Sequence, residues 1–359
     1  MGFFIPFLLT FDPMKYVYFF FVLTSALFIG ACNENNPQVA ANEPAAPQVK
    51  FDSTLSSINA RIEADPNNFK NYLERAEYFS QISNFVDALR DVERAMAIDS
   101  TQGEIFLKKG DIHSKMLDEK KAYKDYSQCI LLEPKNTDCL LKKAYLDIVL
   151  KNYPLALSLI NDALKINETL PYAYYLKGKL YKETGDTTLA CSSYQTAIEV
   201  DPTYYEAYIE AGLLFHNRKH ELAKEYYRSA IEVRPTSIEP WYNLAMFLQE
   251  TGYKKNTNYK EAFACYDSIL KIDPQFAAAP FNKGYIYLEY LQQYDSAAYY
   301  FSKSIDLFPK YYQAYYNRGL SNESMNKRQE AESDYRMALN IKPDYTEAAR
   351  SLDRLLKGK

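Results

Sequence analysis

Joints that break a helix recur along this chain at a nearly constant spacing, and this period limits the possible folds more than any other feature. Proline lacks an N–H group and clashes with the preceding helical turn, so it marks a boundary between helices. Seven joints end in proline: Pro66, Pro134, Pro202, Pro235, Pro274, Pro309 and Pro343. Ser100 and Glu168 occupy the two missing places, and the intervals are 34, 34, 34, 34, 33, 39, 35 and 34 residues. A fixed period in this range indicates stacked supersecondary units.

Small and large residues recur in phase with this period when each repeat is numbered so that its joint is position 32. Position 8 is always small: Ala76, Gly110, Ala144, Gly178, Gly212, Ala245, Gly284 and Gly319. Position 20 is always alanine: Ala88, Ala122, Ala156, Ala190, Ala223, Ala262, Ala297 and Ala331. Position 24 is large: Val92, Tyr126, Ile160, Tyr194, Tyr227, Tyr266, Phe301 and Tyr335. We expect two antiparallel helices per repeat, A and B, that meet at positions 8 and 20, with larger residues filling the space between successive pairs.

This pattern resembles the tetratricopeptide repeat family, and the resemblance covers residues 67–343. It implies an all-α fold, a right-handed α-solenoid of about eight helix pairs. Residues 51–66 are then a half-repeat helix and residues 344–359 a C-terminal capping helix with a polar outer face. Repeat 6 carries extra residues around 252–262. Repeat 7 has Pro280 at position 4, which predicts a late helix start with Pro280 in the first turn.

Residues 1–31 predict a signal peptide, with translation starting at Met14. A short basic start, an uninterrupted apolar run and small residues precede Cys32. The ending Ile29-Gly30-Ala31-Cys32 resembles the lipobox of bacterial lipoproteins, which implies cleavage after Ala31 and lipid attachment at Cys32. The alternative is an uncleaved membrane helix that ends in an incidental cysteine.

The segment that follows predicts a tether to the bacterial cell envelope. After the lipidated cysteine, residues 33–50 contain Pro, Ala and Asn and almost no large apolar residue, which predicts a disordered coil spanning roughly 20–25 Å. Asn33 stands where the known inner-membrane retention signal has aspartate, so the outer membrane is favoured over the inner one. Which face of that membrane the protein occupies stays open.

Composition narrows the possible ligands. The net charge is −4 and no Lys/Arg stripe dominates, so nucleic acid is not an expected partner. The five cysteines lack metal-binding spacing, and His216 and His220 lack a third ligand, so we expect no metal and no cofactor. Cys129 and Cys139 flank one joint. They are either small buried thiols or a disulfide formed in an oxidising envelope.

Aromatic and asparagine side chains gather on the expected A helices of the later repeats. In the tetratricopeptide family the concave surface of these helices binds extended peptides or partner helices, and asparagines at position 6 resemble the asparagine ladder of some members. The candidate partner-binding residues are Tyr175, Tyr242, Asn243, Phe281, Asn282, Tyr285, Tyr316 and Asn317. The alternatives are that position 5 packs between adjacent A helices and that the asparagines are ordinary polar surface.

The sequence therefore favours a lipid-anchored envelope scaffold that binds a protein or peptide partner. A glycan or peptidoglycan binder is the alternative, since exposed aromatic rings can stack on sugars. No GxSxG nucleophile motif, phosphate-binding loop or Cys/His pair is present, so we do not expect an enzyme.

Overall fold

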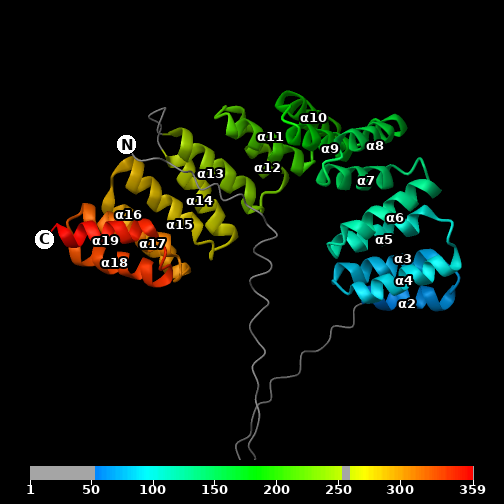
Figure 1. Cartoon of the computed structure of the whole chain (residues 1–359), viewed down its shortest axis with the longest axis horizontal. Helices are drawn as coiled ribbons and strands as arrows, with labels where there is room; N and C mark the ends of the chain where they lie inside the picture. The colour runs from blue at the N-terminus through cyan, green and yellow to red at the C-terminus, as the bar shows by residue number, and fades with distance from the viewer. Residues whose placement is uncertain (1–52, 253–258, 359) are drawn as a thin grey trace, which may run out of the picture. The chain divides into compact units, whose positions relative to one another are not determined.

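The computed structural model describes residues 53–252 and 259–358, and throughout these residues the chain forms helices and no strand (Figure 1). The predicted signal peptide, Cys32, the tether and most of the repeat 6 insertion lie outside the described residues. The first helices of the repeats (helices A) are α3 (Phe69–Gln81), α5 (Gly103–Lys115), α7 (Thr137–Val149), α9 (Pro171–Glu183), α11 (Tyr205–Asn217), α13 (Ile238–Gly252), α15 (Ala278–Tyr285) and α17 (Tyr312–Ser324). The second helices (helices B) are α4 (Phe85–Ile98), α6 (Glu119–Leu132), α8 (Tyr153–Ile166), α10 (Thr187–Val200), α12 (Leu222–Val233), α14 (Lys260–Ile272), α16 (Tyr294–Leu307) and α18 (Arg328–Ile341).

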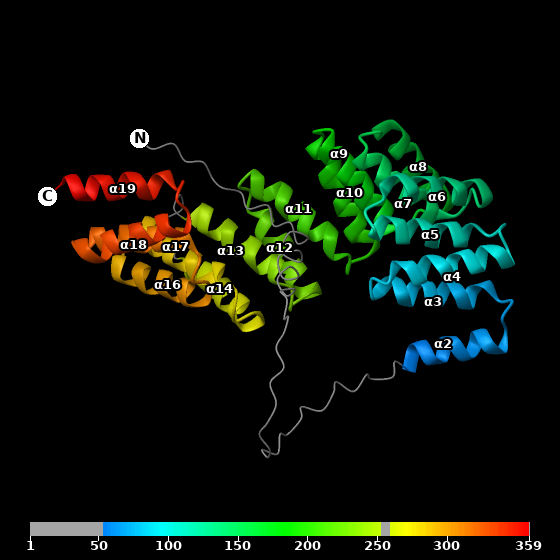
Figure 2. The same ribbon diagram turned by 60° about the horizontal axis from the view of Figure 1, so that its bottom comes forward.

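These sixteen helices stack in chain order, with one further helix at each end (Figures 1 and 2). Each helix A packs against helix B of its own repeat, and each helix B packs against the next helix A. Helix α2 (Ser53–Ala64) covers the first repeat, and α19 (Thr346–Lys357) covers the last one with Ala348 and Leu355 buried. The predicted all-α solenoid of tetratricopeptide-like helix pairs is confirmed.

The ring at position 24, rather than the alanine at position 20, fills the space that the glycine at position 8 leaves open. A Cβ atom added to Gly110, Gly178 or Gly212 would lie 2.5 Å from a ring carbon of the tyrosine at position 24 of the same repeat. The aromatic residues at position 24 therefore pack between helices A and B of their own repeat. From the sequence we expected such residues to fill the space between successive repeats. The alanines at position 20 are buried as expected.

Positions 8 and 24 consequently change together. Repeats 1 and 3 carry alanine at position 8, and there position 24 holds the smaller Val92 and Ile160. Repeat 6 breaks this rule, because Ala245 accompanies Tyr266. In that repeat α13 runs on to Gly252, and the ring of Tyr259, just before α14, packs against this glycine at 2.6 Å from its notional Cβ. The described ends of the insertion thus repeat the glycine–tyrosine contact about two helical turns after position 8.

Repeat 7 accommodates its extra residue and Pro280 within its helix A. Its interval of 35 residues exceeds the usual period by one, and α15 continues as a π-helical segment, η2 (Ile286–Leu291). A π-helical turn accommodates one extra residue without changing the faces that precede and follow it. Pro280 is the third residue of α15 and lies in its first turn, as predicted.

Cys129 and Cys139 form a disulfide across the joint between repeats 2 and 3, so the structure selects one of the two alternatives that the sequence left open. Their Cα atoms are 6.0 Å apart, and both side chains are buried. Cys265 is a free buried thiol, and burial raises its pKa to about 12. Cys191 is also free and partly exposed.

The glycine–ring contact can be tested with a double-mutant cycle in repeat 4. We expect Gly178→Ala to lower the free energy of unfolding by about 1–3 kcal/mol, because its Cβ overlaps the ring of Tyr194. In a Tyr194→Ile background, which recreates the natural Ala144 and Ile160 pair of repeat 3, the same change should destabilise by less than it does alone. Urea unfolding of the four proteins measures the coupling, and strict additivity would contradict the proposed contact.

Candidate partner-binding face

The surface formed by helices α3, α5, α7, α9, α11, α13, α15 and α17, which we call the A face, is where successive repeats touch directly. Helices A of neighbouring repeats are in contact at α3–α5, α7–α9 and α11–α13. All the candidate residues on described helices belong to this set: one on α9, two on α13, three on α15 and two on α17. Their type and helix were predictable, whereas their surroundings were not.

The aromatic residues at position 5 pack across to the next repeat. Their partner is the residue at position 34, which lies one or two residues before the next helix A or, for Tyr316, before the capping helix α19. The pairs and ring-centroid distances are Tyr175–Tyr204 at 5.7 Å, Tyr242–Phe276 at 5.9 Å, Phe281–Tyr311 at 4.8 Å and Tyr316–Tyr345 at 5.2 Å. The Phe281–Tyr311 rings are stacked, and the Tyr242 and Tyr316 pairs are edge to face. Each position 5 ring thus serves the joint between repeats.

The two positions are matched in every repeat, and this signal was available in the sequence. Where position 5 is aromatic, position 34 is aromatic too. Where position 5 is Leu73, Leu107, Leu141 or Ile209, position 34 is Gln102, Asn136, Leu170 or Ser237. The match is not visible when each position of the repeat is compared only with the same position in other repeats, because it links two different positions, 5 and 34.

An aromatic residue at position 34 replaces a helix cap. Asn136 at this position accepts a hydrogen bond from the backbone N–H of Cys139, and Asn68 caps α3 in the same way. Tyr204, Tyr311 and Tyr345 make no side-chain cap. A lost cap costs about 1 kcal/mol and an aromatic pair contributes about 0.5–1.5 kcal/mol beyond its buried area, so the exchange is nearly balanced.

Two of the three asparagines in the position 6 row are buried and already bonded. Asn282 and Asn317 are each 8% exposed. The Asn282 amide donates to the Tyr242 hydroxyl at 3.3 Å, and the Asn317 amide donates to the Gln313 carbonyl of its own helix at 2.9 Å. Asn243 is half-buried on α13. Of the row, Asn243 has the most accessible amide for a peptide backbone.

The earlier repeats use the A face differently. Lys108 at position 6 pairs with Glu77 at position 9 of the preceding repeat at 2.8 Å, and Lys142 pairs with Asp111 at 3.3 Å. In repeats 5 to 8 position 9 is instead apolar and half-buried: Leu213, Met246, Tyr285 and Leu320. Tyr285 also contacts the edge of Tyr290 at 6.1 Å. The A face therefore changes from inter-repeat ion pairs to a partly exposed apolar row along the chain.

Carboxylates crowd the A face where repeats 5 and 6 meet. Glu206 and Glu210 lie on α11 and Glu239 on α13. Burial raises the pKa of Glu239 above its usual range, and Glu210 and Glu206 raise it further. The Tyr205 hydroxyl opposes this shift by donating to Glu239 Oε2 at 2.8 Å. Glu210 is paired with Lys182 at 2.6 Å and Glu206 with Arg234 at 3.0 Å, whereas burial keeps the pKa of Glu239 raised.

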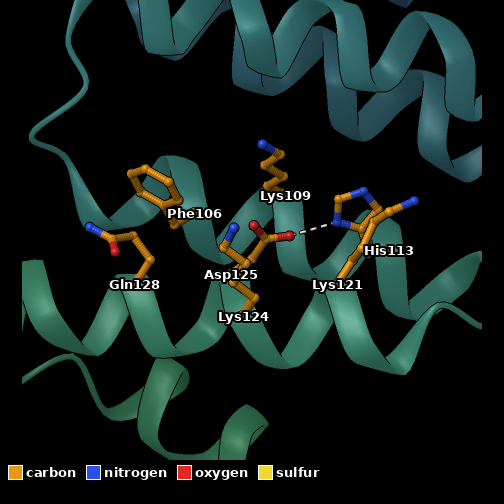
Figure 3. Close-up of a pocket in the computed structure, with 7 residues that line it drawn as sticks. All are labelled: Phe106, Lys109, His113, Lys121, Lys124, Asp125 and Gln128. Atoms are coloured by element: carbon orange, nitrogen blue, oxygen red, sulfur yellow. Dashed lines mark hydrogen bonds and ion pairs between the residues drawn. The ribbon is translucent and has the colours of Figure 1, made fainter.

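A depression between α5 and α6 contains a buried histidine–aspartate pair (Figure 3). Nδ1 of His113 lies 2.6 Å from Oδ2 of Asp125, and both side chains are buried. In repeats 1 and 8 the equivalent aspartates, Asp91 and Asp334, pair with an arginine at position 7. His113 takes over that arginine's role in repeat 2.

Within residues 53–252 and 259–358, no helix is both long and apolar enough to cross a membrane. The same residues contain no group of three or more His, Cys, Asp or Glu side chains arranged to hold a metal ion.

Comparison with known proteins supports the repeat assignment. The model of the tetratricopeptide repeat matches residues 103–136, 171–204, 205–237 and 312–345, which are four of the eight predicted repeats. These repeats of the chain are tetratricopeptide repeats.

Similar proteins extend over more of the chain at low identity. A DnaJ homolog subfamily C member 7 homolog from Dictyostelium discoideum is 22% identical over 84% of this chain, which spans only 54% of that relative. The C-terminal part of a TPR repeat-containing protein from Cytophaga hutchinsonii is 21% identical, with a TM-score of 0.45 over 63% of this chain and 91% of the other. A tetratricopeptide repeat protein from Parabacteroides merdae is 18% identical, with a TM-score of 0.45 over 71% of this chain and 98% of the other.

The Glu239 environment predicts a pH-dependent stability. A carboxyl whose pKa is raised by folding stabilises the native state below the unfolded pKa of about 4.3, and that contribution is lost as the pH rises through the higher native pKa. Glu239→Gln keeps an acceptor for Tyr205 and removes the charge. We expect this variant to melt at a higher temperature than the wild type at pH 7 and at the same temperature near pH 4. A lower melting temperature at pH 7 would contradict the assignment, and Glu225→Gln, at an exposed position on α12, is the control.

Proposed function

We propose that this protein is a lipid-anchored scaffold of the bacterial cell envelope that holds a protein or peptide partner on the A face of repeats 5 to 8. The observation that carries the proposal is the apolar row at position 9. Leu213, Met246, Tyr285 and Leu320 stay partly exposed at the place where repeats 1 and 2 use ion pairs to close the surface. Partly exposed apolar side chains that recur at one position of successive repeats are typical of a protein interaction surface.

The surroundings of this row fit an extended chain. Asn243 can both donate and accept a hydrogen bond, which suits contact with a peptide backbone. The rings at position 5 lie beside the row and are held by their position 34 partners, so a partner would meet a preformed surface rather than order it. The proposed function is binding and involves no catalysed reaction.

Two independent features support the envelope location. The sequence ending at Cys32 has the residues of a lipobox, and the segment after it has the composition of a tether. The Cys129–Cys139 disulfide favours an oxidising compartment, because reducing systems keep most cytosolic thiols free. An envelope protein satisfies both.

Site-specific crosslinking tests the binding face. A benzophenone amino acid placed at Asn243 on the A face should capture a defined protein in intact cells, whereas the same residue at the exposed Met337 on α18 should not. Mass spectrometry identifies the captured species. A partner captured equally from both positions, or from Met337 alone, would contradict the A face as the binding surface. Capture of saccharide instead of protein would favour the glycan-binding alternative.

Chemical analysis of the mature protein tests the location. We expect its N-terminal peptide to begin at Cys32 and to carry acyl chains, and we expect Cys32→Ser to release the protein from membranes. In the non-reduced protein unfolded in denaturant, iodoacetamide should alkylate Cys191 and Cys265 and leave Cys129 and Cys139 unmodified. An unacylated, unprocessed N-terminus would refute the anchor. Free thiols at both disulfide positions would separately refute the oxidising compartment.

A further inference from the structure

The turns between helices A and B expose an unusual number of aliphatic side chains in the first three repeats. These side chains are between 41% and 71% exposed: Ile82, Val86, Met116, Leu117, Val149 and Leu150. Because successive helices are antiparallel, all A–B turns lie at one edge of the stack and all joints at the opposite edge (Figure 2). We call the edge formed by the turns after α3, α5 and α7 the turn edge.

One residue of the turn edge is apolar at a position where the backbone disfavours it. Each of seven A–B turns contains one residue with positive φ: Ser83, Leu117, Lys151, Gly185, Lys219, Gln292 and Asn326. Glycine and asparagine suit this conformation, whereas a bulky aliphatic residue does not. Leu117 has a φ of 60° and is 58% exposed, so neither the local backbone nor the core accounts for a leucine there.

The described chain begins at this same edge. The Arg75 guanidinium of α3 donates to Asn59 of α2 at 2.8 Å, and Arg61 pairs with Glu74 at 2.6 Å, so the two helices run antiparallel. Ser53 lies six residues before Asn59, and Gln81 lies six residues after Arg75. This register puts the start of α2 beside the end of α3, next to Ile82 in the first turn.

We propose that the turn edge of repeats 1 to 3 rests on the lipid surface to which the chain is anchored, an inference that rests on the membrane anchor of the proposed function. Ser53, the first described residue, lies at this edge, and the coil predicted for residues 33–50 would span only roughly 20–25 Å, so we expect the edge to be held close to the bilayer. Anchoring makes contact with lipid effectively intramolecular, which allows a small apolar surface to suffice.

The chemistry of the edge suits lipid better than a shaped protein partner. Its aliphatic side chains project from successive turns. A lipid surface can contact all of these turns, because lipid needs no shape complementary to theirs. Lys115, Lys120, Lys121 and Lys151 lie in or beside these turns; Lys115 pairs with Glu77 and Lys121 with Asp118, so the edge is close to neutral. Lysine stems and aliphatic side chains together are typical of surfaces that bind the boundary of anionic membranes.

Fluorescence quenching by brominated lipid tests this orientation in the full chain. With Trp241, the only tryptophan, replaced by phenylalanine, a tryptophan reporter is introduced by Leu117→Trp or Leu150→Trp. On vesicles of phosphatidylglycerol and phosphatidylcholine with brominated acyl chains, both reporters should lose fluorescence. The matched controls Leu131→Trp and Ile166→Trp, at exposed positions towards the joint edge, should keep it. Unquenched reporters on the turn edge, or equal quenching at both edges, would overturn the proposal.

A second arm separates failure of this proposal from failure of the lipid anchor. A chain that starts at Asn33 keeps all the described helices. An N-terminal histidine tag and a nickel-chelating lipid can hold this chain on vesicles. The same pattern of quenching is expected even if Cys32 carries no lipid in cells. If the turn-edge reporters are not quenched in this experiment either, the proposed lipid contact of the turn edge is wrong, and the lipid anchor at Cys32 is not affected by that result.

Removing one leucine gives a further check that does not depend on reporters. In the tagged chain, with the nickel-chelating lipid kept at a low mole fraction so that the tag alone binds weakly, Leu117→Gly should lower partition into these vesicles by up to about tenfold. Because glycine suits the positive φ at this position, the melting temperature should stay the same or rise, so unfolding cannot explain the loss. Leu131→Gln at the opposite edge should leave partition unchanged, and partition unaffected by Leu117→Gly would overturn the proposal.

Discussion

The ring that helix B inserts against a glycine of helix A fixes the geometry on which the remaining structure depends. Tyr126, Tyr194 and Tyr227 occupy the volume that a Cβ atom at position 8 would fill. Each repeat therefore has a set distance and rotation between its two helices, and the next repeat packs against a surface that is already defined. The glycines weaken helix A by up to about 1 kcal/mol each, and the buried ring more than offsets this. Where the ring becomes Val92 or Ile160, alanine replaces glycine and the same distance is kept.

The sequence was sufficient to predict the helices because helix breakers and small residues recur at fixed positions. Helix boundaries, buried alanines and the place of Pro280 all follow from that recurrence. The contacts between positions 5 and 34, such as Phe281 with Tyr311, were missed because they cross a joint and link two columns of the repeat. The π-helical segment in repeat 7 was missed because one extra residue can enlarge either a turn or a helix, and only packing selects between them. The disulfide depends on redox conditions as well as distance, so spacing alone left it open.

The candidate site shows why residue type alone is a weak guide to binding. Aromatic rings and asparagines are enriched both at interfaces and between repeats, since both environments favour rigid apolar area and satisfied amides. Tyr316 contacts Tyr345, and Asn317 bonds to its own helix, so these two residues already have structural roles. Of the apolar residues at position 9, Tyr285 was a candidate from sequence, but Leu213, Met246 and Leu320 were not, because they are ordinary in a helix. They stand out only once the structure shows the ion pairs at the equivalent positions in repeats 1 and 2.

The two proposed surfaces are compatible because they lie at right angles within each repeat. The turn edge contains the ends of helices A and B, whereas the A face runs along the sides of helices A. A bilayer that touches Leu117 and Leu150 would therefore meet the helices of repeats 2 and 3 end-on, and the sides of those helices would stay open to solvent. The apolar row that includes Met246 and Tyr285 belongs to later repeats, farther along the chain from the tether. A scaffold held in this way can keep its first repeats on the lipid and still offer its later repeats to a partner.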